Sequence, residues 1–356
     1  GGSLNITASN TNGVANYNLK ANGTSINTAA ATASYAFNHT NITGNQNYEL
    51  EVTQGTTTIV KKFTAVVSPT VVSETIPAGL VDGINYNPND ATKATLVLDA
   101  PLKDFVYVAG SFNNWQPTAA YAMKKDASAG STKFWLELTG LTAGTNYTYQ
   151  YWVVDQTPLA GSPSLVKAAD PYSTLVLSPY DDGGIPATSF PNLPAYPSGQ
   201  EREVTWFKTG QTPYAWSQAT LNFVKPAKEK LVVYEVLVRD FDARRNFQDL
   251  IDKIDYFKNL KVNAIQLMPV MEFEGNESWG YNTSFHMALD KFYGTPEKLK
   301  ELIDLYHQNG IAVILDVALN HAFGRNSMVR MWMNDPDGDG FGSPTTENPY
   351  FNTVAK

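Results

Sequence analysis

The chain has 356 residues, more than one compact domain usually holds, and 43% of them are hydrophobic, which allows two or three packed cores. Its formal net charge of −8 disfavours a nucleic-acid partner or an anionic membrane surface, because both would repel an acidic protein. The absence of cysteine excludes disulfides, thiolate metal sites and a cysteine nucleophile. A neutral ligand fits this composition.

Residues 1–72 are predicted to form a small β-sandwich. Apolar and polar residues alternate in YNLKANG, NYELEVTQG and TTTIVKKFTAVV, and turn signals such as Asn-Gly and Gln-Gly separate these stretches. This alternation is typical of short antiparallel strands with one buried face. The region has no cluster of histidines or carboxylates, so we interpret it as a spacer domain.

Residues 77–200 are predicted to form a second β-sandwich. Strand-like stretches recur as ATLVLDA, FVYVAGSF, KFWLELTG and YTYQYWVVD, and Gly, Pro, Asn or Asp bounds each of them. The region ends in SPYDDGGIPATSFPNLPAYPSGQ, a connector rich in Pro and Gly without periodicity.

Residues 201–356 follow a different pattern, in which apolar strands alternate with amphipathic helices. Strands are predicted over 231–238, 262–270 and 311–317, with helices after Asn246 and Thr295 as N-caps. This alternation predicts a parallel sheet covered on both faces, either doubly wound or part of a (β/α)8 barrel. The loop after the first strand has no glycine, which disfavours a phosphate site. The loop after the second strand is rich in aromatic and polar residues, which favours a carbohydrate.

These strands and loops resemble the α-amylase superfamily, glycoside hydrolase family 13. The resemblance lies in YEVLVRDF, VNAIQLMPV, WGYN and DVALNH, in this order and spacing. VYVAGSFNNW, YQYWVVD and ADPYS in the middle domain resemble the early-set sandwich known as carbohydrate-binding module family 48. The implied fold is multidomain: two immunoglobulin- or early-set-like β-sandwiches followed by the first part of a (β/α)8 barrel.

The resemblance implies a sugar site in the barrel loops. Tyr281 would stack on the sugar in the subsite before the scissile bond, His321 would hydrogen-bond that sugar, and Asp316 would order the loop. Asn320 is a calcium ligand in calcium-dependent members of the family. The alternatives are a core role for Tyr281 and a histidine that caps loop carbonyls for His321. Trp279 is either a sugar contact or a loop-packing residue.

The stretch NDPDGDGFG holds alternate carboxylates at Asp335, Asp337 and Asp339, which together suit a calcium ion. The register of an EF-hand loop fails, because its twelfth position is Thr346 and Glu347 comes one residue late. A calcium site and a solvated acidic turn are both open; no organic cofactor is expected.

Trp115 matches the glycan-stacking tryptophan of the binding module, but Gln150 stands where that module has lysine. Its platform is therefore incomplete, and we favour a structural module that does not bind glycan.

The catalytic carboxylates of the family follow later barrel strands, so we expect the nucleophile and the acid/base beyond Lys356 and no catalytic residue in this chain. Asp240, Asp242, Glu272 and Glu274 lie near strand ends, but they do not correspond to those carboxylates. Because three β/α units leave open sheet edges, we expect a truncated or proteolysed chain, or half of a barrel that a second chain completes. Alone it should be inactive.

The leading hypothesis is the N-terminal part of a retaining glycoside hydrolase that degrades starch or glycogen, with an α-1,4/α-1,6-glucan as substrate. The alternatives are a branching transglycosidase of α-glucan and a non-catalytic glucan-binding protein. The Thr/Asn-rich first sandwich suggests an exported bacterial protein, periplasmic, cell-surface or secreted. Because the chain begins with Gly-Gly-Ser, we expect that a native leader was removed. No membrane span is expected, because no apolar run approaches about 20 residues.

Overall fold

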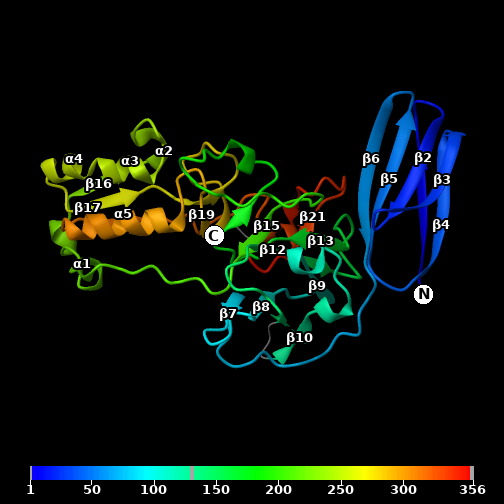
Figure 1. The fold of residues 1–356 in the computed structure, drawn as a ribbon, viewed down its shortest axis with the longest axis horizontal. Helices are drawn as coiled ribbons and strands as arrows, with labels where there is room; N and C mark the ends of the chain where they lie inside the picture. The colour runs from blue at the N-terminus through cyan, green and yellow to red at the C-terminus, as the bar shows by residue number, and fades with distance from the viewer. Residues whose placement is uncertain (1, 129–131, 353–356) are drawn as a thin grey trace.

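The computed structural model describes residues 2–128 and 132–352. Its elements form three regions along one long axis (Figure 1). An antiparallel sandwich lies at one end, a second sandwich lies in the middle, and a parallel sheet with helices lies at the other end. No helix within the described residues is long and apolar enough to span a membrane.

The first region is built from antiparallel strands, as the alternating stretches predict. Three predicted strands correspond to β2 (Ala15–Ala21), β5 (Gln46–Gln54) and β6 (Thr57–Ala65), which form a sheet in the order β3-β2-β5-β6. The strands β1 (Gly2–Ser9), β3 (Thr24–Thr32) and β4 (Ser34–Ile42) were not predicted, although Leu4, Ile6 and Ala8 alternate with polar residues in β1. β1 pairs with β4.

The second region has one sheet in the order β10-β11-β8-β7 and another in which β12 pairs with β9, β13 and β15. The strands of the first sheet are β7 (Gly83–Tyr86), β8 (Ala94–Asp99), β10 (Lys124–Asp126) and β11 (Lys133–Leu138). Those of the second are β9 (Phe105–Gly110), β12 (Tyr147–Val154), β13 (Leu165–Ala168), β14 (Val176–Leu177) and β15 (Val204–Phe207).

The position of β15 corrects the domain boundary predicted between residues 200 and 201. This strand pairs with both β12 and β14, so the second sandwich extends at least to Phe207. The sequence did not predict β15 for three reasons: the strand is only four residues long, it follows a connector rich in Pro and Gly, and its pairing partners are distant in sequence.

The third region contains a three-stranded parallel sheet in the order β16-β17-β20, which confirms the predicted parallel strands. Its strands are β16 (Val233–Val236), β17 (Ala264–Leu267) and β20 (Ala312–Leu315). The α-helices are α1 (Gln218–Leu221), α2 (Val238–Phe241), α3 (Phe247–Asp252), α4 (Ile254–Asn259), α5 (Pro296–Gln308) and α6 (Ser327–Arg330). Short 3₁₀ turns occupy Ser111–Asn113, Ala119–Tyr121, Asp182–Gly184 and Lys228–Lys230.

The structure confirms the predicted N-caps of the helices. It differs from the prediction in one helix and in how the sheet is covered. Asn246 accepts a hydrogen bond from the Gln248 backbone N–H at its N-cap, but the single helix expected after it is divided into α3 and α4 at Lys253. The sheet is not covered on both faces within the described residues, since Val233 and Leu315 are 43% exposed.

The loops of the third region return to the middle of the molecule. The hairpin of β18 (Met271–Phe273) and β19 (Thr283–Leu289) lies in the loop after β17. The chain after β20 runs through α6 to β21 (Met333–Asn334) and β22 (Ser343–Pro344), beside the second sandwich (Figure 1). Trp332 is 2% exposed in the core of that sandwich, and its Nε1–H donates to the Pro101 carbonyl over 2.9 Å.

Candidate functional site

The loops after β17 and β20 bring Tyr281 and Asp316 together. Asp316 directly follows β20, and its Oδ2 accepts a hydrogen bond from the Tyr281 hydroxyl over 2.6 Å. This hydrogen bond and then burial raise the pKa of Tyr281 to about 12. The phenol therefore stays protonated at neutral pH, while the side chain remains 38% exposed. An exposed ring held by a carboxylate is not the core aromatic of the structural alternative.

His321 contacts the same loop through the backbone of Tyr281. Its Nε2–H donates to the backbone carbonyl of Tyr281, so a neutral ring keeps Nδ1 as a free acceptor. His321 therefore caps a loop carbonyl, as its structural alternative predicts, and its exposed side chain can still accept one hydrogen bond from a ligand.

A second histidine, which the sequence did not single out, supports this loop. His286 on β19 lies 3.3 Å from the His321 carbonyl through Nε2, and its Nδ1 lies 3.3 Å from the Asn326 amide nitrogen. One neutral tautomer, protonated at Nε2, satisfies both contacts. The only hint of His286 in the sequence was its position in the loop after the second predicted strand, which is rich in aromatic and polar residues.

A cleft with a volume of about 730 Å³ lies beside His321. Polar and apolar side chains line it, among them His286, Asn320, Met328 and Phe351. Tyr281 and Trp279 are not among its lining residues. Trp279 is 62% exposed, which disfavours loop packing as its role. This cleft has room for a short oligosaccharide, since ligand pockets span about 300–1,000 Å³.

The four carboxylates near strand ends all have partners. Asp240 pairs with Arg239 and Asp242 with Lys253 at 2.6 Å and 3.2 Å. The Glu274 carboxylate accepts from the backbone N–H of Arg325 over 2.9 Å, and Glu272 forms a buried ion pair with Lys291. Each of these carboxylates is therefore held by an ion pair or a hydrogen bond, as expected of a structural residue.

A buried ionic cluster lies behind the site. The Lys291 ammonium contacts Glu272 and lies 3.4 Å from Asp182 of the connector. Burial raises the pKa of Glu272 to about 7, although Lys291 opposes the shift. Arg325 pairs with Asp181 and lies 3.9 Å from Glu203. Sequence reasoning named Glu272 but missed Lys291 and Arg325, because Asp181, Asp182 and Glu203 lie far away along the chain and only the fold brings them together.

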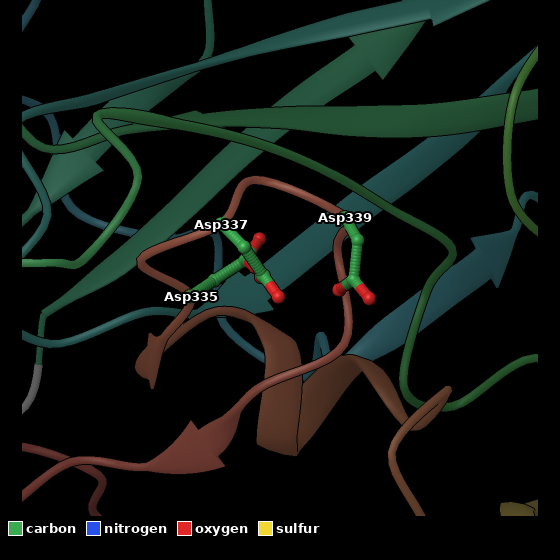
Figure 2. A group of neighbouring side chains, drawn as sticks. All are labelled: Asp335, Asp337 and Asp339. Carbon is green, nitrogen blue, oxygen red and sulfur yellow. The ribbon is translucent and has the colours of Figure 1, made fainter.

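The acidic turn brings Asp335, Asp337 and Asp339 together (Figure 2). One carboxylate oxygen from each lies within 4.8 Å of the others. Asn320, which was grouped with them as a potential metal ligand, lines the cleft beside His321. The pocket that borders Asp335 is formed by other residues. The structure therefore supports a three-carboxylate set without Asn320.

The residues expected on the glycan platform of the second sandwich are buried. Trp115 is 9% exposed and packs in a cluster with Phe105 and Trp152. Gln150 is fully buried, and its amide donates to the backbone carbonyls of Glu201 and Glu203. Neither side chain presents a free face to a glycan, which favours the structural interpretation of this module.

Replacement of Trp115 with phenylalanine is expected to lower the free energy of unfolding by about 1–2 kcal/mol, because a smaller ring leaves a void in the cluster. Urea denaturation followed by tryptophan fluorescence measures this change, and calorimetric titration with maltoheptaose measures glucan affinity. Unchanged stability together with weakened glucan binding would contradict the structural role.

In β/α folds the loops at the carboxyl ends of the strands usually carry the functional residues, and here these loops are rich in aromatic and polar side chains. Residues 240–340 match the family model of the α-amylase catalytic domain. This segment is therefore similar to the catalytic domain of the α-amylases.

Curated relatives match this chain in part. Malto-oligosyltrehalose trehalohydrolase of Saccharolobus solfataricus is 40% identical over 100 residues, which are 28% of this chain and 18% of that enzyme. The 1,4-alpha-glucan branching enzyme of Corynebacterium diphtheriae is 28% identical over 219 residues, which are 61% of this chain and 26% of the enzyme. The chain thus spans about a quarter or less of the length of these relatives.

Two solved structures share the fold. The Group B Streptococcus pullulanase SAP in complex with maltotetraose superposes with a TM-score of 0.51 at 18% identity, covering 97% of this chain and 49% of that one. The catalytic module of the glycogen-degrading pneumococcal virulence factor SpuA gives 0.52 at 22% identity, covering 75% of this chain and 42% of that one.

Proposed function

We propose that this chain is the N-terminal part of a retaining α-glucan-active glycoside hydrolase and that its third region begins a (β/α)8 barrel. The observation that carries the proposal is the contact among Tyr281, Asp316 and His321 within a segment that matches the α-amylase catalytic domain. In this proposal the exposed face of Tyr281 packs against a glucose ring, and Nδ1 of His321 accepts a sugar hydroxyl.

The proposal assigns no bond cleavage to the chain alone. Retaining hydrolysis needs two carboxyl groups about 5 Å apart, one as nucleophile and one as acid/base. Asp240, Asp242, Glu272 and Glu274 are held in ion pairs or by a backbone N–H instead. We infer that the catalytic pair is supplied by further sequence or by a second chain.

The test is to read the gene onward from the codon of Lys356 and to assay the product. A Gly-x-Arg-x-Asp stretch within about one more β/α unit is expected, as is release of reducing sugar from starch or glycogen by the protein with the complete catalytic domain. The 356-residue chain should release none. Reducing-sugar release by that chain alone would overturn the assignment.

Tyr281→Ala in the protein with the complete catalytic domain is expected to lower kcat/KM on starch by about 100-fold, because the sugar loses the surface that positions it. Tyr281→Phe keeps the ring and loses only the hydrogen bond to Asp316, so about a tenfold loss is expected. Tyr256→Ala, on the surface of α4, is the matched control. Equal activity of the Tyr281→Ala variant and this control would contradict sugar stacking.

A branching transglycosidase is the second candidate. It is favoured by the alignment with the branching enzyme of Corynebacterium diphtheriae, which covers 61% of this chain and so extends beyond the catalytic-domain match. The products separate the two activities: hydrolysis creates new reducing ends, whereas branching converts α-1,4 into α-1,6 linkages at a constant number of reducing ends. The non-catalytic glucan-binding alternative is weakened by the burial of Trp115.

A further inference from the structure

The turn that follows β21 holds one carboxylate oxygen whose hydrogen-bonding capacity is unused. Asp335 is 8% exposed, and its Oδ2 accepts a hydrogen bond from the Gly340 backbone N–H over 2.9 Å. Its Oδ1 is buried and lacks a hydrogen-bond partner among the residues that the structure describes. A buried carboxylate oxygen without a donor or cation is costly, so a cation or an ordered water is expected to satisfy it.

The neighbouring arginines leave the carboxylates of the turn available. Arg202 donates to the backbone carbonyl of Asp339, and Nε of Arg330 lies 3.4 Å from the carbonyl of Gly340. Burial, followed by repulsion from Arg202, lowers the pKa of Arg330 to about 10. Both of these contacts with the turn end on backbone carbonyl oxygens and not on carboxylates. The arginines therefore hold the backbone of the turn.

The spacing of the carboxylates matches the chemistry of calcium. Asp335, Asp337 and Asp339 alternate along the turn, and one oxygen from each lies within 4.8 Å of the others (Figure 2). Gly340 occupies the sixth position with φ +82°, where a calcium loop needs a sharp turn. We propose that this turn binds one Ca²⁺ through the three aspartates, with backbone carbonyls and water completing its six to eight oxygen ligands.

The turn lies against the second sandwich, so a bound ion would have a structural role there. The backbone N–H of Asp335 donates to the carbonyl of Gly161 in the second sandwich over 2.7 Å. The adjoining pocket, about 240 Å³ in volume, is bordered by Phe63 of the first sandwich, Lys167 of the second and Arg330 of the third region. A bound Ca²⁺ would offset two of the three negative charges at this junction and hold the turn against the second sandwich.

Calcium binding is tested on the intact 356-residue chain after removal of metals with a chelator. Isothermal titration with CaCl₂ is expected to show one saturable site, and Ca²⁺ at about 100 times Kd should raise Tm by about 3–5 °C. Asp337→Asn and Asp339→Asn, both at exposed positions, should each raise Kd by about tenfold or more. Asp335→Asn should abolish binding.

Asp255→Asn on α4 is the matched control, and its Kd for Ca²⁺ should equal that of the unmodified chain. MgCl₂ should bind more weakly, because Mg²⁺ demands near-ideal octahedral geometry. An absence of both heat and a Tm shift with CaCl₂ would overturn the proposal. So would unchanged affinity in the Asp337→Asn and Asp339→Asn variants, which decide the question if Asp335→Asn does not fold.

Discussion

Trp332→Ala is expected to lower the free energy of unfolding by about 3–5 kcal/mol, the cost of deleting a large buried aromatic side chain. Trp332 lies in the segment that matches the α-amylase catalytic domain, yet its side chain fills the core between the two sheets of the second sandwich. The substitution also leaves the Pro101 carbonyl without the indole N–H that donates to it.

Urea denaturation followed by near-ultraviolet circular dichroism measures this loss. Trp279→Ala is the matched control, because this side chain is 62% exposed and its removal should change the free energy of unfolding by about 0.5 kcal/mol or less. A similar stability for both variants would show that Trp332 does not contribute to the sandwich core.

Lys291→Met is the second substitution with a large expected effect: a loss of about 3–5 kcal/mol in the free energy of unfolding at pH 8, because it leaves buried carboxylates without their cation. Burial by itself lowers the pKa of Lys291, but Glu272, Asp182 and Asp290 more than offset this, so its pKa is raised and the ammonium stays charged. Burial raises the pKa of Asp290 well above its usual range.

The effect of Lys291→Met should depend on pH. The folded pKa of Glu272 is about 7, above its ordinary value of 4.5. A carboxyl whose folded pKa is raised contributes stability below its unfolded pKa, and that contribution is lost as the pH rises through the folded value. Without Lys291 the carboxyls fold at low cost only when protonated, so the variant should lose much less stability at pH 5 than at pH 8.

Thermal unfolding of the variant and the unmodified chain between pH 5 and pH 8 measures this difference. Lys298→Met removes an exposed pair with Glu301 and should cost about 1 kcal/mol or less across this range. A loss for Lys291→Met that is the same at both ends of the range would argue against buried carboxylates as its cause.

Alternation of apolar and polar residues and helix-capping residues predicted those strands and helices that depend on short stretches of sequence. The alternation in YNLKANG and KFWLELTG corresponds to β2 and β11, and the cap at Thr295 with Pro296 marks the start of α5. Packing against distant segments decided the rest. β15 is recognisable only through its pairing with β12, and the paired hairpin β18–β19 was expected as an extended loop.

For the candidate site too, the sequence predicted some residues, and others became apparent only from the fold. The family resemblance named Tyr281, Asp316 and His321, and the structure places them in contact, while their roles toward a sugar remain predictions. Nothing in the local sequence pointed to Arg325, because its carboxylate partners come from the connector and the second sandwich. Lys291 contacts Glu272 of β18 and lies near Asp182 of the connector, and only the fold brings these two carboxylates to the same ammonium. Export and completion of the barrel by a second chain also remain predictions.

The bridge from Arg325 to Asp181 and Glu203 limits how such proteins can be recombined. Arg325 follows the loop that carries His321, and its two carboxylate neighbours belong to the connector and the second sandwich. A chimera whose sandwich lacks acidic residues at the positions of Asp181 and Glu203 would leave a largely buried guanidinium without its carboxylates. A crossover point before the second sandwich would keep Arg325 together with both of its carboxylates.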